Sequence, residues 1–213
     1  MRRRKKPGAK EKLLNHELHL CKEPEKYKGN WKEYFLEKRP IHVELGTGRG
    51  QFITTLAAQN PEINFIGIEI KEEILLKAVE KAVTQGLRNV TFLWYDVNKL
   101  NEVFADGELS RIYINFCDPW PKTRMAKRRL THRNFIERYK KFLREQGEIH
   151  FKTDNEKLFE FSLNEFAACD LQLKHITFDL HHSDMKDNVT TEYEDKFSSM
   201  GMKIYRCEAA KRN

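Results

Sequence analysis

The sequence predicts an α/β fold built on a mostly parallel sheet. Strand and helix patterns alternate from Pro40 onward, and a glycine-rich turn follows the first predicted strand. Strand–helix alternation gives parallel sheets with right-handed crossovers, whose ligands bind beyond the carboxyl ends of the strands. That edge is marked by acids that close the first four predicted strands, namely Glu44, Glu69, Asp96 and Asp118.

The individual elements follow from local patterns. Residues 41–45 form a short strand, and the glycine turn leads into a helix over 51–59. Residues 64–70 are almost entirely apolar, as in a strand covered on both faces. Apolar residues recur at helical spacing from Ile74 to Val83, and Gly86 ends that helix. The remaining elements are strands over 90–95, 111–117 and 148–153, helices over 132–143 and 157–168, and two closing strands over 171–180 and 203–209, which we expect to pair antiparallel.

Length and composition limit the possible classes of protein. The 213 residues predict a single domain over 29–213, preceded by a basic stretch over 1–28 that opens with Arg2–Lys6 and is either a partly mobile arm or a solubilising tail. The four cysteines have no Cys-x-x-Cys spacing, and we see no signal peptide and no apolar run of about 20 residues. We therefore expect reduced thiols, a cytoplasmic location and no membrane contact. The histidines lack ligand spacing, so no metal is predicted.

The turn Gly46-Thr47-Gly48-Arg49-Gly50 is the first part of a predicted cofactor site. Glycines let the backbone turn tightly and approach a ligand closely. A nicotinamide dinucleotide site is the alternative, but its fingerprint wants glycine where Gln51 stands and would place a pyrophosphate beside Glu44. S-adenosylmethionine carries a sulfonium and an ammonium and no phosphate, so this anionic pocket favours it. Glu69 suits the ribose hydroxyls of either cofactor, and Asp96 suits an adenine amino group, although an acid there more often caps a helix.

A second feature, separate from the cofactor site, is a basic segment that directly follows Asp118. Five of the eight residues from Lys122 to Arg129 are basic, and the candidate contacts to nucleic acid are Arg124, Lys127, Arg128 and Arg129. A solvated charged face is the alternative interpretation. The position of the basic segment beside Asp118 favours a polyanionic ligand. Charge alone does not separate RNA from DNA. The predicted cofactor site and the basic segment together predict a nucleic-acid methyltransferase.

The chain resembles a class I methyltransferase and, more narrowly, the bacterial tRNA (guanine-N7-)-methyltransferase family. The resemblance runs from about Pro40 to the C-terminus. Besides the acids and the glycine turn, it rests on Asp118-Pro119-Trp120-Pro121-Lys122, Arg128-Arg129-Leu130, Phe151-Lys152-Thr153-Asp154 and Thr191-x-Tyr193-Glu194-x-Lys196.

The resemblance implies a Rossmann-like fold with a seven-stranded sheet, helices on both faces and an antiparallel C-terminal strand. It implies transfer of a methyl group from S-adenosylmethionine to N7 of guanosine at position 46, in the variable loop of tRNA. Asp118 would be catalytic, and the target guanosine would contact Lys122, Asp154, Thr191, Tyr193 and Glu194. The cofactor would be held by Glu44, Gly46, Gly48, Glu69, Asp96 and Asp118.

Chemistry at N7 makes modest demands on these side chains. Guanine N7 already presents a lone pair, so alignment matters more than a strong base. Asp118 can accept from guanine N–H groups and stabilise the growing positive charge, while Asp154 and Glu194 can hold the amino and imino edge. Tyr193 either stacks on the base or packs in the core, and core packing is the favoured role.

Other functions stay open at this point. The tetrapeptide Asp118–Pro121 is similar to that of enzymes that methylate exocyclic amines, although there the aromatic residue follows two prolines. Cys117 as a nucleophile for cytosine C5 methylation is less favoured than Cys117 as a buried apolar filler. A non-catalytic tRNA-binding protein and a dinucleotide oxidoreductase are further alternatives. Either a monomer or a homodimer is compatible with the sequence.

Overall fold

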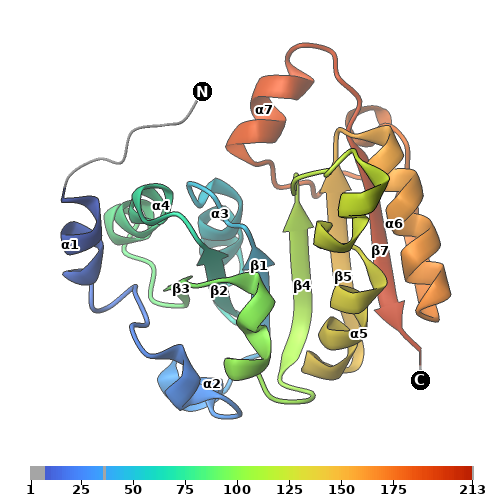
Figure 1. Ribbon diagram of the computed structural model, residues 1–213. Coiled ribbons are helices and arrows are strands. Elements are labelled where there is room, and N and C mark those ends of the chain that lie inside the picture. Colours follow the sequence, from blue (N-terminus) through green and yellow to red (C-terminus); the bar gives the residue numbers. More distant parts are fainter. Residues whose placement is uncertain (1–7, 36, 213) are drawn as a thin grey trace. The chain divides into compact units, whose positions relative to one another are not determined.

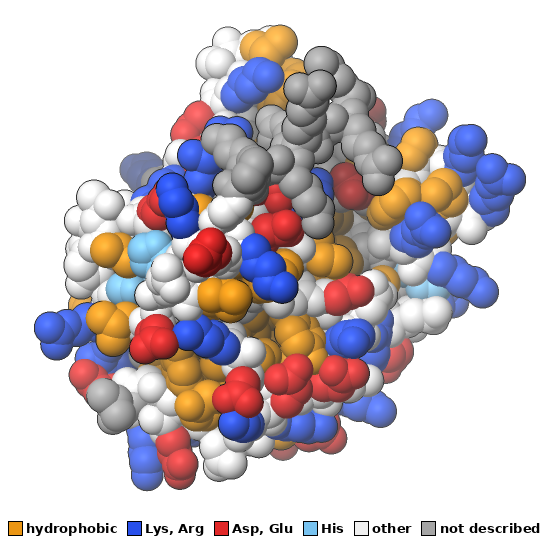
Figure 2. Space-filling model, turned by 60° about the vertical axis from the view of Figure 1, so that its left-hand side comes forward, with side chains coloured by type: hydrophobic (Ala, Val, Ile, Leu, Met, Phe, Trp, Pro, Cys, Tyr) orange, Lys and Arg blue, Asp and Glu red, His pale blue; other side chains and the backbone are white. Residues whose placement is uncertain are grey.

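The computed structural model describes residues 8–35 and 37–212, so the basic run Arg2–Lys6 lies outside the described residues. The chain divides into two compact units, Met1–Phe104 and Ala105–Asn213, here called unit 1 and unit 2 (Figure 1). On the face shown in Figure 2, Lys and Arg side chains alternate with Asp and Glu, as expected when 33% of all residues are charged.

Unit 1 contains three parallel strands in the order β3-β2-β1. They are β1 (Ile41–Leu45), β2 (Asn64–Glu69) and β3 (Val90–Trp94), and nearly all of their residues are buried. Helices α3 (Gln51–Gln59) and α4 (Glu72–Thr84) pack on these strands and on each other. Two acids in the first turn of α4 suit the positive end of its dipole. A short 3-10 helix, η2 (Val97–Glu102), follows β3.

The described part of the predicted arm packs onto unit 1. Helix α1 (Ala9–Leu14) contacts α4 through a face that includes the buried Leu13, and Leu20 forms a parallel bridge with Phe92 of β3. After η1 (Pro24–Tyr27), helix α2 (Trp31–Tyr34) places Trp31 in the core, where its indole N–H donates to the carbonyl of Val103 at 2.9 Å. We expected ordered structure to begin at Trp31, but it begins well before that residue, with α1.

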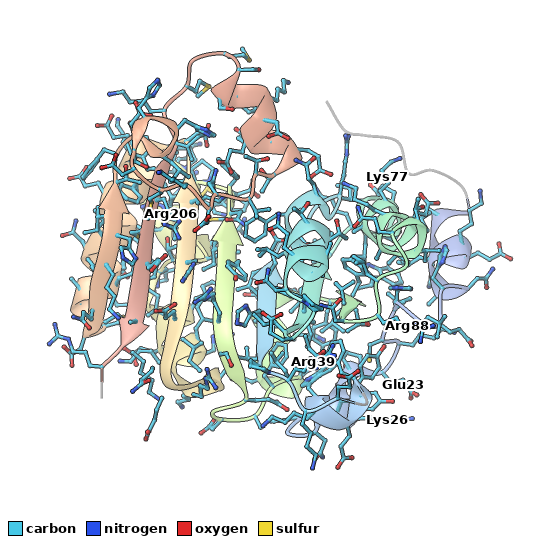
Figure 3. The ribbon with its side chains drawn as sticks, turned by 180° about the vertical axis from the view of Figure 1, so that it is seen from behind. Glu23, Lys26, Arg39, Lys77, Arg88 and Arg206 are labelled. Carbon is cyan, nitrogen blue, oxygen red and sulfur yellow. The ribbon has the colours of Figure 1, made fainter. Side chains whose placement is uncertain are left out.

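Unit 2 contains four strands in the order β4-β5-β7-β6. Strand β4 (Leu109–Asn115) is parallel to β5 (Leu143–Thr153), and β7 (Tyr205–Lys211) runs antiparallel to both β5 and β6 (Leu171–Thr177). Helices α5 (Arg133–Phe142) and α6 (Glu156–Ala168) cover one face of these strands (Figure 1). The opposite face, seen in Figure 3, carries polar side chains such as Arg206. Three shorter helices are η3 (Thr123–Arg128), η4 (Leu180–His182) and α7 (Glu192–Ser198).

The predicted sheet of seven mostly parallel strands with an antiparallel C-terminal strand is confirmed. Three local expectations were wrong. Strand β5 begins at Leu143 rather than at residue 148, because the chain passes directly from α5 into it. Strand β4 ends at Asn115, before Phe116 turns into the left-handed region. Helix α7 lies between the two closing strands, where the sequence predicted no element.

Among the described helices, none combines the length and the apolar character that crossing a bilayer demands. All four cysteines are free thiols, and Cys21, Cys169 and Cys207 are buried.

Candidate active site

The glycine turn of unit 1 leaves room for a ligand. Gly46 and Gly48 have φ angles of 76° and 59°, a region that favours glycine, and a Cβ atom added to either would meet no other atom within 4 Å. The backbone N–H groups of Gly46 and Thr47 both donate to the carbonyl of Ile68 in β2, at 2.8 and 2.9 Å. The turn is thus fastened to the sheet while its outer side stays open.

Two of the predicted acids border this turn. Glu44 is buried, and its carboxylate accepts a 2.6 Å hydrogen bond from the hydroxyl of Thr47. The Oε1 atom of Glu69 accepts from the backbone N–H groups of Ile70 and Lys71, at 2.9 and 3.0 Å. Its Oε2 atom accepts only a longer bond, 3.3 Å, from Gly48. Because a carboxylate oxygen offers two lone pairs, Oε2 keeps acceptor capacity toward a ligand in the turn.

Asp96 follows β3 and caps η2. Its Oδ1 atom accepts from the backbone and side-chain N–H groups of Asn98, at 2.9 and 2.8 Å. The helix-cap interpretation of this acid is therefore confirmed, and both bonds use the same oxygen. The second oxygen, Oδ2, is the one suited to an amino group of a bound ligand.

In unit 2, Asp118 lies exposed on a loop whose backbone is strained. Phe116 and Trp120, two residues to either side, have φ angles of 51° and 41°, which bulky residues rarely adopt. Burial, with the nearby Asp118 charge, raises the pKa of the Cys117 thiol to about 12. A thiol that stays protonated at neutral pH is a poor nucleophile, which disfavours cytosine C5 chemistry.

Asp154 follows β5, the strand that lies parallel to the one before Asp118, so both acids stand beyond the carboxyl ends of neighbouring strands. The Tyr193 hydroxyl donates to Oδ2 of Asp154 at 3.1 Å, and its ring lies 4.9 Å from that of Phe116 and 4.2 Å from that of Phe197. Tyr193 is 41% exposed, so the favoured core-packing role was wrong. An exposed ring that is hydrogen-bonded to an acid offers a surface on which a base can stack.

Glu194 does not face solvent. Its side chain is fully buried and accepts a 2.6 Å hydrogen bond from Nζ of Lys152, itself only 5% exposed. The Lys152 ammonium also donates to Oδ1 of Asn188 (3.2 Å) and to the carbonyl of Val189 (2.8 Å), and Nδ2 of Asn188 donates to the second Glu194 oxygen at 2.7 Å. The pair therefore fastens the segment that carries Thr191 and Tyr193 to β5. We missed Lys152 as a positioning residue, although a charged residue inside an apolar strand was a visible signal.

Thr191 begins α7 as its N-cap, because its hydroxyl accepts from the backbone N–H of Glu194 at 2.9 Å. Lys122 lies exposed at the start of η3.

The basic segment divides into two kinds of residue. Arg124, Lys127 and Arg128 are exposed on η3, and the Arg128 guanidinium lies 4.9 Å from the ring of Trp120. Arg129 is only partly exposed and donates to two backbone carbonyls, those of Pro119 at 2.9 Å and Trp120 at 3.1 Å.

One group of possible metal ligands occurs among the described residues, Glu148, His150 and Glu208 on the open face of unit 2. A hydrogen bond with His150 and the charge of Arg111 hold the pKa of Glu148 at about 2, while Arg206 pairs with Glu208. Since arginines already neutralise both carboxylates, we interpret the group as an ion-pair network.

Comparison with known proteins gives full-length matches. A family profile described as "Putative methyltransferase" matches residues 38–207. A tRNA (guanine-N(7)-)-methyltransferase of Clostridioides difficile is 61% identical, with all of both chains covered. The protein of the same name from Brevibacillus brevis is 54% identical over 99% of this chain and 98% of its own.

Solved structures with much lower identity share the fold. A 16S rRNA methyltransferase, KamB, superimposes with a TM-score of 0.67 at 11% identity, covering 87% of this chain and 94% of its own. A SAM-dependent methyltransferase from Aquifex aeolicus gives a TM-score of 0.56 at 16% identity, covering 97% and 99%. These likenesses confirm the Rossmann-like methyltransferase fold. On the evidence of its full-length relatives, the chain belongs to the tRNA (guanine-N(7)-)-methyltransferase family.

Proposed function

We propose that this chain transfers the methyl group of S-adenosylmethionine to N7 of a guanosine in tRNA, at position 46 in the variable loop. The observation that carries the proposal is the 61% identity, over the whole chain, with a protein named for this activity. The side-chain arrangement is compatible with it, since an exposed acid is followed directly by an exposed basic segment. We expect the reaction to take place in the cytoplasm.

The residues present in unit 1 suit S-adenosylmethionine. The open space in front of Gly46 and Gly48 would receive the cofactor, with Glu69 accepting from ribose hydroxyls and Asp96 from the adenine amino group. Glu44 keeps a buried negative charge behind the turn, which opposes a pyrophosphate there. When bound, the cofactor supplies a methyl group on a positively charged sulfur.

Asp118 is the proposed catalytic residue. Guanine N7 needs no deprotonation, so the chain has to align the base and stabilise the positive charge that the purine gains. A carboxylate fixed beside the ring does this selectively as the charge develops. Asp118 can accept from guanine N–H groups, and the strained loop around it limits its freedom to turn away.

Recognition of the guanosine is assigned to a second group of side chains. Asp154 accepts from the amino and imino edge, and the exposed Tyr193 ring, held by its bond to Asp154, offers a stacking surface. Lys122 follows Asp118 by four residues and Thr191 precedes Tyr193 by two, and both contact the nucleotide in this proposal. Glu194 contributes indirectly, by holding the Thr191–Tyr193 segment through Lys152.

Replacing Asp118 by Asn tests the assignment, since it keeps the side-chain shape and removes the charge. We expect turnover on transcribed tRNA to fall by roughly 10²–10³-fold, as when a preorganised polar group is removed from a transition state. Binding of S-adenosylmethionine, measured by calorimetry, should change little. Asp106→Asn, at an exposed acid in the turn before β4, is the matched control and should retain turnover.

Identification of the modified nucleoside decides the reaction itself. The wild-type chain, given labelled cofactor and bulk tRNA, should produce 7-methylguanosine. A methyl group on an exocyclic amine would overturn the proposed function, whereas an Asp118→Asn variant active within a few-fold of wild type would remove only the role of Asp118.

A further inference from the structure

The loop around Asp118 is strained on both sides of the acid. Phe116 and Trp120 both adopt positive φ angles, which are unfavourable for bulky residues. Strain of this kind persists only where surrounding contacts over-determine the conformation. One of those contacts is the backbone N–H of Phe116, which donates to the carbonyl of Lys152 in β5 at 2.9 Å. The part of the loop after Asp118, which contains Trp120, also needs a contact that holds its conformation.

Arg129 supplies that contact. Its Nε and Nη2 atoms donate to the carbonyls of Pro119 and Trp120, the two residues directly after Asp118. The planar guanidinium also lies 4.3 Å from the ring of Phe161 on α6. One rigid group thus joins the two carbonyls that follow the acid to a helix of the core.

The chain around Arg129 is fastened to the same helix. The hydroxyls of Thr131 and Ser162, both completely buried, are 2.7 Å apart. Arg133 pairs with Glu165 at 2.7 Å. Arg129 therefore stands at the beginning of a segment that has little freedom to move.

We propose that Arg129 is a positioning residue for Asp118 and not a ligand of tRNA phosphates, an assignment that rests on the proposed function. Its donors already point at the protein backbone, whereas Arg124 and Lys127 in the same segment are exposed. Of the basic residues that the sequence assigns to RNA contact, Arg128 lies against the ring of Trp120, whereas Arg129 donates hydrogen bonds to the backbone of the loop.

Lysine in place of arginine separates the two roles. A lysine keeps the positive charge and still serves a phosphate as a point charge, but it cannot reproduce the planar fork that reaches two carbonyls and stacks on a ring. If Arg129 holds the loop, Arg129→Lys should disrupt this role. If Arg129 binds a phosphate, Arg129→Lys should largely retain that binding. Arg88→Lys, at an exposed arginine of unit 1, is the matched control, and Arg124→Gln tests an exposed arginine of the basic segment.

The experiment compares Arg129→Lys and Arg129→Gln with Arg88→Lys and Arg124→Gln. For Arg129→Lys we expect kcat on tRNA to fall by roughly 10²-fold, as for a misplacement of about 1 Å, with the Kd for tRNA and its salt dependence nearly unchanged. Hydrogen exchange of backbone amides in residues 116–120 of the free protein should become faster. Arg88→Lys should resemble wild type in all of these measurements, and Arg124→Gln should lower the salt slope by about one phosphate contact.

Two results would overturn the proposal. One is an Arg129→Lys variant with near-wild-type kcat and unchanged exchange. The other is an Arg129→Gln variant that lowers the salt slope as Arg124→Gln does. If the Arg129 variants do not fold, Phe161→Leu removes the ring on which Arg129 stacks, together with the ring contact to His132. Unchanged exchange in residues 116–120 of this variant would contradict a role for Arg129 in holding the loop. Should wild type form no 7-methylguanosine, the proposed function fails, while the exchange measurement still decides whether Arg129 holds the loop.

Discussion

Lys152 and Glu194 form an ion pair in the interior of unit 2, 42 residues apart in the chain. Their side chains are 5% and 0% exposed, and the ammonium uses its three donors on Glu194, Asn188 and Val189. Removing Lys152 leaves the buried Glu194 with His181 at 3.2 Å and Asn188 at 2.7 Å as its remaining side-chain partners, and breaking a buried pair in this way costs about 3–5 kcal/mol. Lys152→Met should therefore lower the free energy of unfolding by about that amount in a urea titration.

The double variant Lys152→Met, Glu194→Met separates stability from function. Two apolar side chains of similar length remove both charges, and such replacements of buried pairs are often neutral or stabilising. Unfolding free energy should recover, but turnover should stay low, because the Thr191–Tyr193 segment has lost its anchor to β5. A single Lys152→Met variant that unfolds within about 1 kcal/mol of wild type would contradict the importance of this pair.

At the scale of secondary-structure elements, the glycine turn combines two separate requirements. Gly50 packs between α3 and α4, since a Cβ atom there would lie 2.6 Å from Cβ of Ala78. Gly48 faces open space instead, so its side of the turn is available to a ligand. Both residues have positive φ, at 81° and 59°.

The variants Gly50→Ala and Gly48→Ala should therefore fail in different ways. Gly50→Ala combines a clash with backbone strain and should lower the free energy of unfolding by roughly 2–4 kcal/mol. Gly48→Ala meets no atom, so it should cost only about 1–2 kcal/mol from its φ angle, yet weaken S-adenosylmethionine binding. Chemical denaturation and calorimetry check the two effects, and equal cofactor affinities for Gly48→Ala and wild type would remove this glycine from the site.

How far the sequence predicts each element depends on whether its signal is local. Helix α4 and strand β2 were predicted almost to their ends because long apolar patterns define them. Helix α7 was missed since it is seven residues long and mostly polar, although Thr191 three residues before Glu194 is a capping pattern that could have revealed it. The roles of Glu194 and Arg129 depend on contacts with residues distant in sequence or with backbone carbonyls, and periodicity carries no information about either.

For the whole molecule, the net charge of +7 matters less than where the positive charges stand. Acidic and basic side chains are intermixed on the face shown in Figure 2. Each phosphate that a side chain neutralises releases a counterion and steepens the dependence of the tRNA binding constant on salt. The exposed basic residues of η3 should thus dominate that dependence.

Replacing Arg124, Lys127 and Arg128 together by Ala should weaken tRNA binding and lower the slope of log K against log salt by up to about three contacts. The control is Lys32, Lys77 and Arg88 replaced by Ala, which removes the same charge from exposed positions of unit 1; Figure 3 labels two of them. Filter-binding measurements over a series of salt concentrations compare the two. If only net charge attracts tRNA, both triple variants lose affinity and salt dependence equally, whereas phosphate contacts by η3 flatten the slope of the first variant alone.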